Sequence, residues 1–330
     1  MMKHNFFDIR NRSEMPFQIF IGGRGIGKTF SALTEISELS ENEKFLFLRR
    51  QATEIEKLCT DIANPFKAIN RVNNRNISVN FNAKLGLGIF SENEKNIGYC
   101  GALSTFYGLR GIDVEEVVTI LFDEFIPEKL AHPIKDEGLA FLNLYETVNR
   151  NRELLGKPPV KVYFLANSIS LNNPILAELG VINVIHSMIM NGKNRYTDKN
   201  RGLYIEYITN SPISAEKEAT ALYKLSGTDS RFNEQALRNR FDDDTRQVKK
   251  VDLKQFKPLF VYGNCTLYQH KSEVAFHAVM HSVPAQYYFK EYETARLRLL
   301  FAPKYRMIIA SNACTYDSYA TKIYLDNALL

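Results

Sequence analysis

The residues that could do chemistry begin with a glycine-rich octapeptide, Gly22-Gly23-Arg24-Gly25-Ile26-Gly27-Lys28-Thr29. It fits the P-loop pattern, in which a glycine and four free positions precede Gly-Lys-Ser or Gly-Lys-Thr. The glycines let the backbone turn tightly and direct N–H groups at phosphate oxygens. Lys28 can reach the β- and γ-phosphates of ATP, and the Thr29 hydroxyl can bind Mg²⁺. The octapeptide therefore predicts a nucleotide phosphate site, with a chance glycine-rich turn as the alternative.

Apolar segments on both sides place this octapeptide between a strand and a helix. Phe17–Ile21 predicts a short buried strand. Thr29–Glu38 predicts a helix, with Phe30, Leu33 and Ile36 at three-residue spacing. A phosphate at the first turn of this helix would meet free N–H groups and the positive end of the helix dipole. This context favours a P-loop over a chance turn.

A second pair of candidates, Asp123 and Glu124, ends an apolar segment that begins at Val117. Apolar residues followed by Asp-Glu form the Walker B pattern of ATPases. Asp123 would hold Mg²⁺, often through water, and Glu124 would polarise a water molecule for attack on the γ-phosphate. Carboxylates at the end of a strand face the ligand crevice of an open α/β sheet, although surface turns also contain Asp-Glu pairs. With the P-loop upstream, the pair indicates a motor ATPase rather than a small-molecule kinase.

Four further side chains are candidates for the catalytic step. Asn167 ends the next apolar segment, where it could sense the γ-phosphate and orient water; a strand-end turn residue is the alternative. Arg150 lies near the end of a helix expected over Leu139–Leu154, and it could stabilise the transition state at the ATP of a neighbouring subunit. Arg152 is a second candidate for this role, and interaction with the helix dipole is the alternative for both. Arg24 could contact the γ-phosphate of the ATP bound to its own chain, or it could only form hydrogen bonds within the P-loop itself.

The charge distribution permits a nucleic-acid partner. The net charge is +5 and the pI is about 8.8. Residues 245–330 hold twelve Lys or Arg against six Asp or Glu, so the basic excess lies there; a solvated basic face is the alternative. Arg110, in a loop ahead of the Asp-Glu strand, could contact a DNA phosphate. Lys57, Arg71 and Lys95 are candidates of the same kind, with a solvated surface as the alternative for each.

Composition places the chain among globular proteins. Its 330 residues are 45% hydrophobic and 24% charged, which suits one large or two modest domains. The four cysteines form no Cys-x-x-Cys pair, which argues against zinc and fits reduced thiols. The N-terminus lacks an apolar signal core, and no apolar run approaches the ~18 residues that a membrane span needs. We therefore expect a cytoplasmic protein with no membrane partner.

Alternating strand-like and helix-like segments in the first two hundred residues predict the α/β class. The other elements expected there are strands over Phe45–Arg50 and Val162–Ala166, a helix over 52–67 and hairpins over 70–105. The helix over Leu139–Leu154 is expected to turn Leu139, Leu142 and Tyr145 inward. Strands separated by such crossovers imply a mostly parallel sheet with helices on both faces.

The remainder of the chain predicts a linker and a smaller α+β domain. Residues 208–250 are polar and are expected to contain short helices near 215–225 and 232–241. The elements expected beyond them are a hairpin of Leu259–Gln269 with Val274–Val283 that turns at His270–Glu273, a helix over Ala285–Leu300, and strands over Tyr305–Ala310 and Ile323–Leu325. The predicted domains are therefore residues 1–207, the linker 208–250 and residues 251–330.

Together these residues resemble the large-terminase and viral DNA-packaging ATPases, and among them the packaging motors of φ29-like bacteriophages. The resemblance spans roughly residues 17–175 in the family's order. It is carried by the P-loop from Gly22 to Lys28, the strand ending Arg49-Arg50, the segment Phe122–Ile126, the segment from Leu142 to Glu153, and Asn167-Ser168. Beyond residue 200 it rests on order and size.

The resemblance implies an ATPase domain of the ASCE type (additional strand, catalytic glutamate), a linker and an RNase H-like C-terminal domain. It implies a homomeric ring, expected to be a pentamer, at the portal vertex of an empty procapsid in the host cytoplasm. With ATP and Mg²⁺, such a ring would translocate double-stranded DNA into the capsid. Arg150 takes the position of the trans-acting arginine finger. In φ29-like motors the C-terminal domain docks on a packaging RNA.

One departure from the large terminases concerns their nuclease, in which clustered carboxylates hold two metals. The first strand of that domain should carry an aspartate, but Asn264 stands there, and no acid lies between Leu259 and Gln269. Because Asp317 and Asp326 are scattered, we predict that nuclease activity is absent. The alternatives to a packaging motor are another P-loop motor such as a helicase, which often has aromatic platforms for single strands, and a metabolite kinase, which would ignore DNA.

Overall fold

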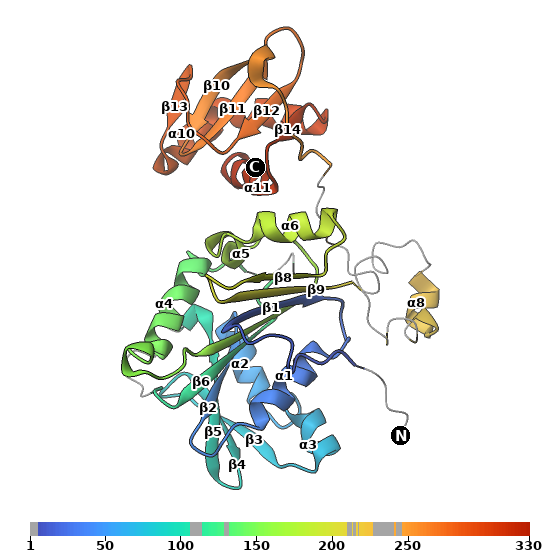
Figure 1. Cartoon of the computed structure of the whole chain (residues 1–330), viewed down its shortest axis with the longest axis vertical. Coiled ribbons are helices and arrows are strands. Elements are labelled where there is room, and N and C mark those ends of the chain that lie inside the picture. Colours follow the sequence, from blue (N-terminus) through green and yellow to red (C-terminus); the bar gives the residue numbers. More distant parts are fainter. Residues whose placement is uncertain are drawn as a thin grey trace. The chain divides into compact units, whose positions relative to one another are not determined.

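A large mixed sheet dominates the N-terminal part of the chain in this computed structural model (Figure 1). The structure describes residues 6–105, 114–128, 132–209, 213, 216, 218–226, 241 and 246–330. Within them, nine strands form one sheet in the order β3-β4-β5-β2-β6-β7-β1-β9-β8. Their bounds are β1 Phe17–Gly22, β2 Lys44–Arg49, β3 Ile77–Asn82, β4 Leu87–Glu92, β5 Lys95–Ala102, β6 Val117–Asp123, β7 Lys161–Ala166, β8 Arg195–Asp198 and β9 Leu203–Ile208. The strands from β5 to β9 in this order run parallel, and an antiparallel strand or hairpin flanks them on each side.

Helices cover both faces of the parallel strands, which confirms the predicted α/β class. Successive side chains of a strand point to opposite faces of its sheet. Along β7, Tyr163 and Leu165 share a core cluster with Leu33 of α1 (Lys28–Ser37). Phe164, between them, packs against Phe141 of α4 (Glu137–Asn149), with 4.8 Å between the ring centroids. A strand buried on both faces explains the continuous apolar runs of the sequence.

The helix predicted over 52–67 is wrong, because the chain forms two helices, α2 (Ala52–Leu58) and α3 (Lys67–Asn73). Pro65 lacks an N–H group and disfavours the helical conformation at Asn64. The Asn64 side chain accepts a hydrogen bond from the Phe66 N–H (2.9 Å) and donates one to the Ile77 carbonyl (2.8 Å). This turn directs α3 against α1. The predicted hairpins follow as β3, β4 and β5.

The predicted inward face of α4 is wrong for Leu139 and Leu142 but holds for Tyr145, which is partly buried and packs on Phe17 with 4.9 Å between the ring centroids. Leu139 and Leu142 are 50% and 37% exposed, whereas Phe141 and Leu144 are buried. Apolar residues occur on both sides of this helix, so their spacing does not select a face. Close packing at Gly138 selects the buried face of α4, because an added Cβ at Gly138 would lie 2.4 Å from the Glu178 Cβ. Glu178 is the last residue of α5 (Pro174–Glu178), which packs on α4.

Sequence periodicity did not predict β8 and β9. β9 is buried along its whole length and pairs in parallel with β1, with Ile208 opposite Gly22. A Cβ at Gly22 would lie 2.9 Å from the Ile208 Cβ. Gly22 is therefore required by packing between strands as well as by the loop that follows it.

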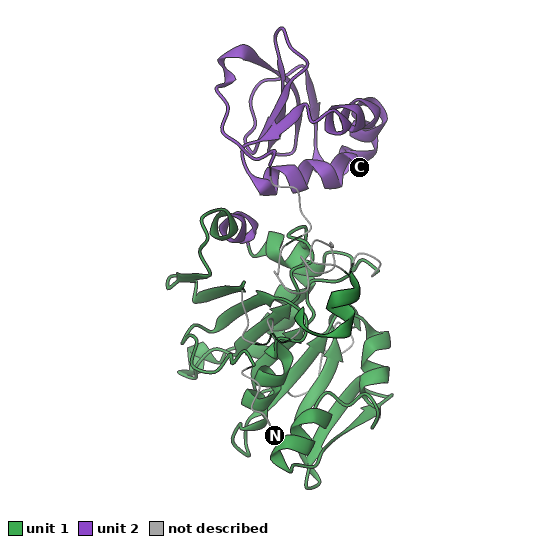
Figure 2. Ribbon diagram, turned by 90° about the vertical axis from the view of Figure 1, so that its right-hand side faces the viewer, with its two compact units in different colours: residues 1–179, 187–242 green, residues 180–186, 243–330 purple. Residues whose placement is uncertain are grey.

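The chain divides into two compact units, residues 1–179 with 187–242 and residues 180–186 with 243–330 (Figure 2). α6 (Ile182–Met190) contains one boundary. In the predicted linker, α8 (Ala221–Ser226) overlaps the helix expected near 215–225. The helix expected over 232–241 falls on residues that, apart from residue 241, lie outside the described ranges. The boundaries predicted at 207 and 250 stay predictions.

The second unit contains a five-stranded sheet in the order β13-β10-β11-β12-β14. Its elements are η3 Leu253–Gln255, β10 Phe256–Tyr262, β11 Cys265–His270, β12 Phe276–Val279, β13 Tyr287–Phe289, η4 Glu291–Glu293, α10 Thr294–Ala310, β14 Cys314–Tyr316 and α11 Tyr319–Leu329. The segment Leu259–Gln269 is not one strand: it folds back at Gly263, whose φ of +53° suits a tight turn. β11 and β12 form the predicted hairpin around His270–Glu273.

The helix predicted over Ala285–Leu300 is right only from Thr294 onward, and the strands predicted over Tyr305–Ala310 and Ile323–Leu325 are wrong. The first segment contains β13 and η4 before α10 begins, and the other two lie inside α10 and α11. Residues of α10 that are of β-forming type bury their side chains at helical spacing, namely Phe301, Tyr305 and Ile308. Tertiary packing here overrides local preference. Among the described residues, no helix is long and apolar enough to cross a membrane.

Candidate nucleotide-binding site

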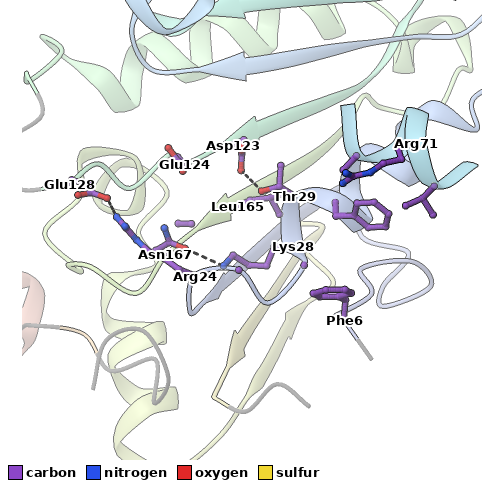
Figure 3. Close-up of a pocket in the computed structure, with 16 residues that line it drawn as sticks. Phe6, Arg24, Lys28, Thr29, Arg71, Asp123, Glu124, Glu128, Leu165 and Asn167 are labelled. Atoms are coloured by element: carbon purple, nitrogen blue, oxygen red, sulfur yellow. Dashed lines mark hydrogen bonds and ion pairs between the residues drawn. The ribbon is translucent and has the colours of Figure 1, made fainter. Parts of the chain in front are cut away.

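Parallel pairing brings the predicted motifs to one edge of the large sheet. β7 lies between β1 and β6, with Ala166 opposite Ile21 and Leu165 opposite Asp123. The P-loop after β1, Asp123 at the end of β6 and Asn167 after β7 therefore meet at the carboxyl ends of their strands (Figure 3). This edge is where open α/β sheets bind ligands.

The P-loop has the backbone shape of an anion site. Gly25 and Gly27 have φ values of +63° and +103°, in the left-handed region that favours glycine. A Cβ at Gly27 would lie 2.7 Å from the Phe6 Cβ, so a larger residue would also collide with the N-terminal segment. Gly27 caps α1 without a side chain, which leaves the N–H groups of the first turn available to a phosphate.

Lys28 joins the P-loop to the end of β7. Its side chain is buried, and its Nζ donates to the carbonyls of Gly22 (3.0 Å) and Gly23 (2.7 Å) and to Asn167 Oδ1 (3.3 Å). A buried ammonium needs several acceptors. Phosphate oxygens could replace these acceptors, and Asn167 lies within hydrogen-bond distance of the same group.

Thr29 and Asp123 provide neighbouring oxygen atoms of the kind that Mg²⁺ prefers. Thr29 Oγ1 donates to Asp123 Oδ1 at 3.0 Å. Burial raises the pKa of Asp123, and the nearby Arg49 guanidinium opposes this shift. A divalent cation would favour the carboxylate form strongly. These residues therefore fit a magnesium ion held beside the P-loop.

Arg49, at the end of β2, binds the Asp-Glu pair, and sequence reasoning did not name it as a site residue. Its Nη1 lies 3.0 Å from Asp123 Oδ2, and its Nη2 lies 2.5 Å from Glu124 Oε2 and 3.2 Å from Glu54 Oε1. Burial opposes the charge on Arg49, but the three carboxylates raise its pKa overall. The sequence feature that could have identified Arg49 is a basic residue at the carboxyl end of a buried parallel strand.

Glu124 has an unusual backbone. Its φ is +53°, in the left-handed region that costs a bulky residue roughly 1–2 kcal/mol. The following N–H, that of Phe125, donates to the Leu165 carbonyl of β7 at 3.2 Å. The Glu124 side chain is 56% exposed although the preceding strand is buried. Such strain is concentrated at functional sites, and here it turns a carboxylate out of the strand toward the cavity.

A cavity of about 1050 Å³ is lined by Lys28, Thr29, Asp123, Glu124 and Asn167, whereas Arg49 is not among the described residues that line it. Arg24 and Glu128 form an ion pair on one side of Lys28 and Thr29, and Phe6 and Arg71 lie on the opposite side (Figure 3). The residues that line the cavity without having been predicted there are Phe6, Phe30, Ala68, Arg71, Val72, Glu128, Leu165 and Ala166. Arg71, which the sequence suggested as a DNA contact, thus borders the nucleotide site. Nothing in the sequence pattern connects the N-terminal segment or α3 with the P-loop.

The other predicted residues lie elsewhere. Arg150 follows α4, is not among the described residues that line the cavity, and donates from Nε to the Thr147 carbonyl (3.2 Å). Arg152 donates to the carbonyls of Pro158 and Glu115, each at 3.1 Å, so its guanidinium holds a turn together. Lys57 is exposed on α2. Arg110 lies outside the described residues.

The topology and the site define a P-loop ATPase of the ASCE class. The additional strand of this class is β7, which separates the P-loop strand β1 from the Asp-Glu strand β6. The family model of the podovirus DNA encapsidation protein (Gp16) matches residues 8–281, and the chain belongs to this family. Comparison with curated protein sequences finds no match.

Two solved structures of packaging motors share the fold. The Phi-28 gp11 DNA packaging motor has 19% identity and a TM-score of 0.64, over 98% of this chain and 96% of that chain. The bacteriophage Phi-29 viral genome packaging motor assembly has 19% identity and a TM-score of 0.60, over 96% of each chain. At this identity the likeness concerns the fold, and the argument for function rests on the family and the site.

Proposed function

We propose that this protein hydrolyses ATP, with Mg²⁺, to move double-stranded DNA into a viral procapsid as one subunit of an oligomeric ring. The observation that carries the proposal is the placement of Asp123 and Glu124 beside Lys28 and Thr29, in one cavity, in a member of the DNA encapsidation family. We further infer that the ring is a pentamer, assembles at the portal in the host cytoplasm, and contacts a packaging RNA through the basic C-terminal unit.

Each group has a role in hydrolysis. The P-loop N–H groups and Lys28 bind the phosphates, while Thr29 and Asp123 hold Mg²⁺. The bound ion would neutralise charge that develops on the phosphate oxygens. Glu124 accepts a proton from the attacking water, and Asn167 orients that water. Arg49, which binds both acids, positions Glu124.

The first test is steady-state ATP hydrolysis with and without linear double-stranded DNA. We expect the duplex to stimulate turnover. Turnover that ignores all DNA but responds to a small phosphoryl acceptor would replace the motor with a kinase. Stimulation by single strands alone would indicate a helicase.

Arg150 is proposed to act on the ATP of a neighbouring copy, because it lies outside the cavity of its own chain and is 43% exposed. Arg150→Ala and Glu124→Gln should each be inactive alone. In a mixture, an Arg150→Ala subunit keeps Glu124 and can receive Arg150 from a Glu124→Gln neighbour, so part of the activity should return. Titration of one variant into the other, with ATP hydrolysis as readout, checks this. No recovery at any ratio would contradict action between subunits.

The apolar end of the cavity is proposed to hold the adenine base. Phe6 and Val72 are 47% and 60% exposed and both line the cavity. Phe6→Ala and Val72→Ala should each raise KM for ATP severalfold with little change in kcat, because the base is bound equally in the ground and transition states. Ile62→Ala, which removes an exposed side chain that does not line the cavity, is the control. A fall in kcat at constant KM would contradict this assignment.

Absence of nuclease activity stays a prediction. Asn264 lies in the exposed turn between β10 and β11, not within a strand. Among the described residues, no three His, Cys, Asp or Glu side chains are grouped as metal ligands. Incubation of the protein with plasmid DNA and Mg²⁺ or Mn²⁺ should leave the plasmid intact; cleavage that survives Glu124→Gln would show a nuclease.

A further inference from the structure

A buried asparagine, Asn173, is hydrogen-bonded to the backbone that follows Glu124. Asn173 is the N-cap residue of α5, and its side chain is buried. Its Nδ2 donates to the Phe125 carbonyl at 3.2 Å. Asn173 is not among the described residues that line the nucleotide cavity. Any effect of this side chain on the reaction must therefore pass through the residue that it holds.

Phe125, the residue after the proposed base, is held at three points. Its N–H donates to the Leu165 carbonyl at 3.2 Å, and its carbonyl accepts the hydrogen bond from Asn173. Its ring is buried and packs on Phe164, with 5.5 Å between the ring centroids. A residue restrained at its N–H, its carbonyl and its side chain cannot rotate freely. The backbone that Glu124 must join is therefore fixed.

Glu124 needs such a restraint because its own conformation is strained. Its φ of +53° lies in the left-handed region, and a strained conformation persists only where the surrounding structure enforces it. More than half of the Glu124 side chain is exposed, so its packing contributes little. The restraint on its backbone must come from the residues on either side, which are Asp123 in β6 and Phe125.

The support from which Asn173 acts is itself rigid. Asn173 Oδ1 accepts from the N–H groups of Ile175 and Leu176, each at 3.0 Å, at the start of α5. α5 in turn packs closely on α4, since a Cβ at Gly138 would lie 2.7 Å from the Pro174 carbonyl oxygen. The oxygen of this amide therefore caps α5, while its nitrogen holds the residue after the proposed base.

We propose that Asn173 is a positioning residue for ATP hydrolysis, whose amide keeps Glu124 in its left-handed conformation with the carboxylate facing the cavity. This inference rests on the proposed role of Glu124 as the base. Loss of the amide donor would release the Phe125 carbonyl and let Glu124 relax toward ordinary backbone angles. The carboxylate would then leave the position from which it accepts a proton from the attacking water. ATP binding should persist, because other contacts hold the P-loop and Asp123.

The test uses Asn173→Ser and Asn173→Asp in the full chain. Both replacements keep an oxygen that can cap α5, because Ser and Asp are favoured N-cap residues, but both remove the amide donor to Phe125. We expect kcat for ATP to fall roughly tenfold to a hundredfold, the effect of a small misplacement of a catalytic group. KM and the binding of a fluorescent ATP analogue should stay near those of the parent. Because only one replacement is charged, a loss shared by both variants excludes the new charge as its cause.

Asn64→Ser is the matched control. Asn64 makes the same two kinds of hydrogen bond before α3, accepting from the Phe66 N–H and donating to the Ile77 carbonyl. Its replacement should lower Tm about as Asn173→Ser does. Because α3 borders the apolar end of the cavity, any effect on turnover should appear in KM and not in kcat. Equal losses of kcat in the two Ser variants would assign the effect to folding and overturn the inference.

The double variant Glu124→Gln/Asn173→Ser separates positioning of the base from a general structural role. If Asn173 acts through Glu124, its replacement should lower the rate of single-turnover hydrolysis no further once the carboxylate is gone. A general structural role would cause the same loss in both backgrounds. That additive result, or an unchanged kcat in Asn173→Ser, would overturn the inference and leave Glu124 as the base. Full turnover in Glu124→Gln alone would overturn the base assignment, and this inference with it.

Discussion

Replacement of Glu124 by Gln is expected to reduce kcat for ATP hydrolysis by roughly a hundredfold to ten-thousandfold, the usual contribution of a positioned general base. Gln has nearly the same shape as Glu, so the left-handed turn should persist, but its amide cannot accept a proton from water. The Asp123–Thr29 pair and the P-loop are untouched, so ATP should still bind. Steady-state turnover together with equilibrium binding of a fluorescent ATP analogue measures both quantities.

Glu128→Gln provides the control for this change. Glu128 lines the same cavity and is 66% exposed, but its carboxylate pairs with Arg24, whereas that of Glu124 pairs with Arg49. Its replacement removes one carboxylate while the proposed base remains, so kcat should fall far less. Retention of turnover in Glu124→Gln, or equal losses in the two variants, would show that Glu124 is not the base.

Replacement of Arg50 by Ala should destabilise the N-terminal unit by roughly 3–5 kcal/mol. The Arg50 guanidinium binds the Glu137 carboxylate in two places, with Nε–Oε1 at 2.5 Å and Nη2–Oε2 at 2.8 Å. Both residues are buried, at 4% and 1% exposure, and the pair joins the end of β2 to the start of α4. The variant would leave the Glu137 carboxylate buried without its counter-charge. Urea unfolding of the full chain, with a probe for the larger unit, measures the loss.

Lys95→Ala is the matched control for an ion pair. Lys95 pairs with Glu41 at 2.6 Å, but the two side chains are 68% and 80% exposed. Pairs of this kind contribute little to stability, because water screens both charges. The double variant Arg50→Met/Glu137→Leu should regain much of the stability lost in Arg50→Ala, because no charge then remains buried. A loss in Arg50→Ala as small as that in Lys95→Ala would contradict the expected cost of an unpaired buried charge.

Local pattern was sufficient for the centre of the ATPase domain. β1, the P-loop and α1 follow one another within about twenty residues, and the order of glycines, Lys28 and Thr29 specifies the turn by itself. Asp123 and Asn167 were identifiable because parallel strands place their carboxyl ends at one edge of a sheet. The strands predicted at Val117 and Val162 were identifiable for another reason: strands buried on both faces leave continuous apolar runs in the sequence.

The second unit shows where local pattern fails. Residues 305–310 and 323–325 contain the aromatic and β-branched residues that favour strands, yet they lie in α10 and α11. Both helices bury their side chains against the small sheet, and that packing outweighs intrinsic preference. In α4, two apolar faces were available, and contact with α5 at Gly138 selected between them.

The sequence by itself identified the groups proposed for the chemistry of this protein: a phosphate loop, an aspartate for Mg²⁺, a glutamate for the base and the strands that carry them. Only the tertiary structure decided what surrounds them. Arg49 binds Asp123 and Glu124 from a separate strand, β2. Phe6 precedes the P-loop in the sequence and Arg71 follows it, yet both line the cavity. The reason is physical: a motif depends on residues that are neighbours along the chain, whereas these contacts depend on how the sheet and its helices pack.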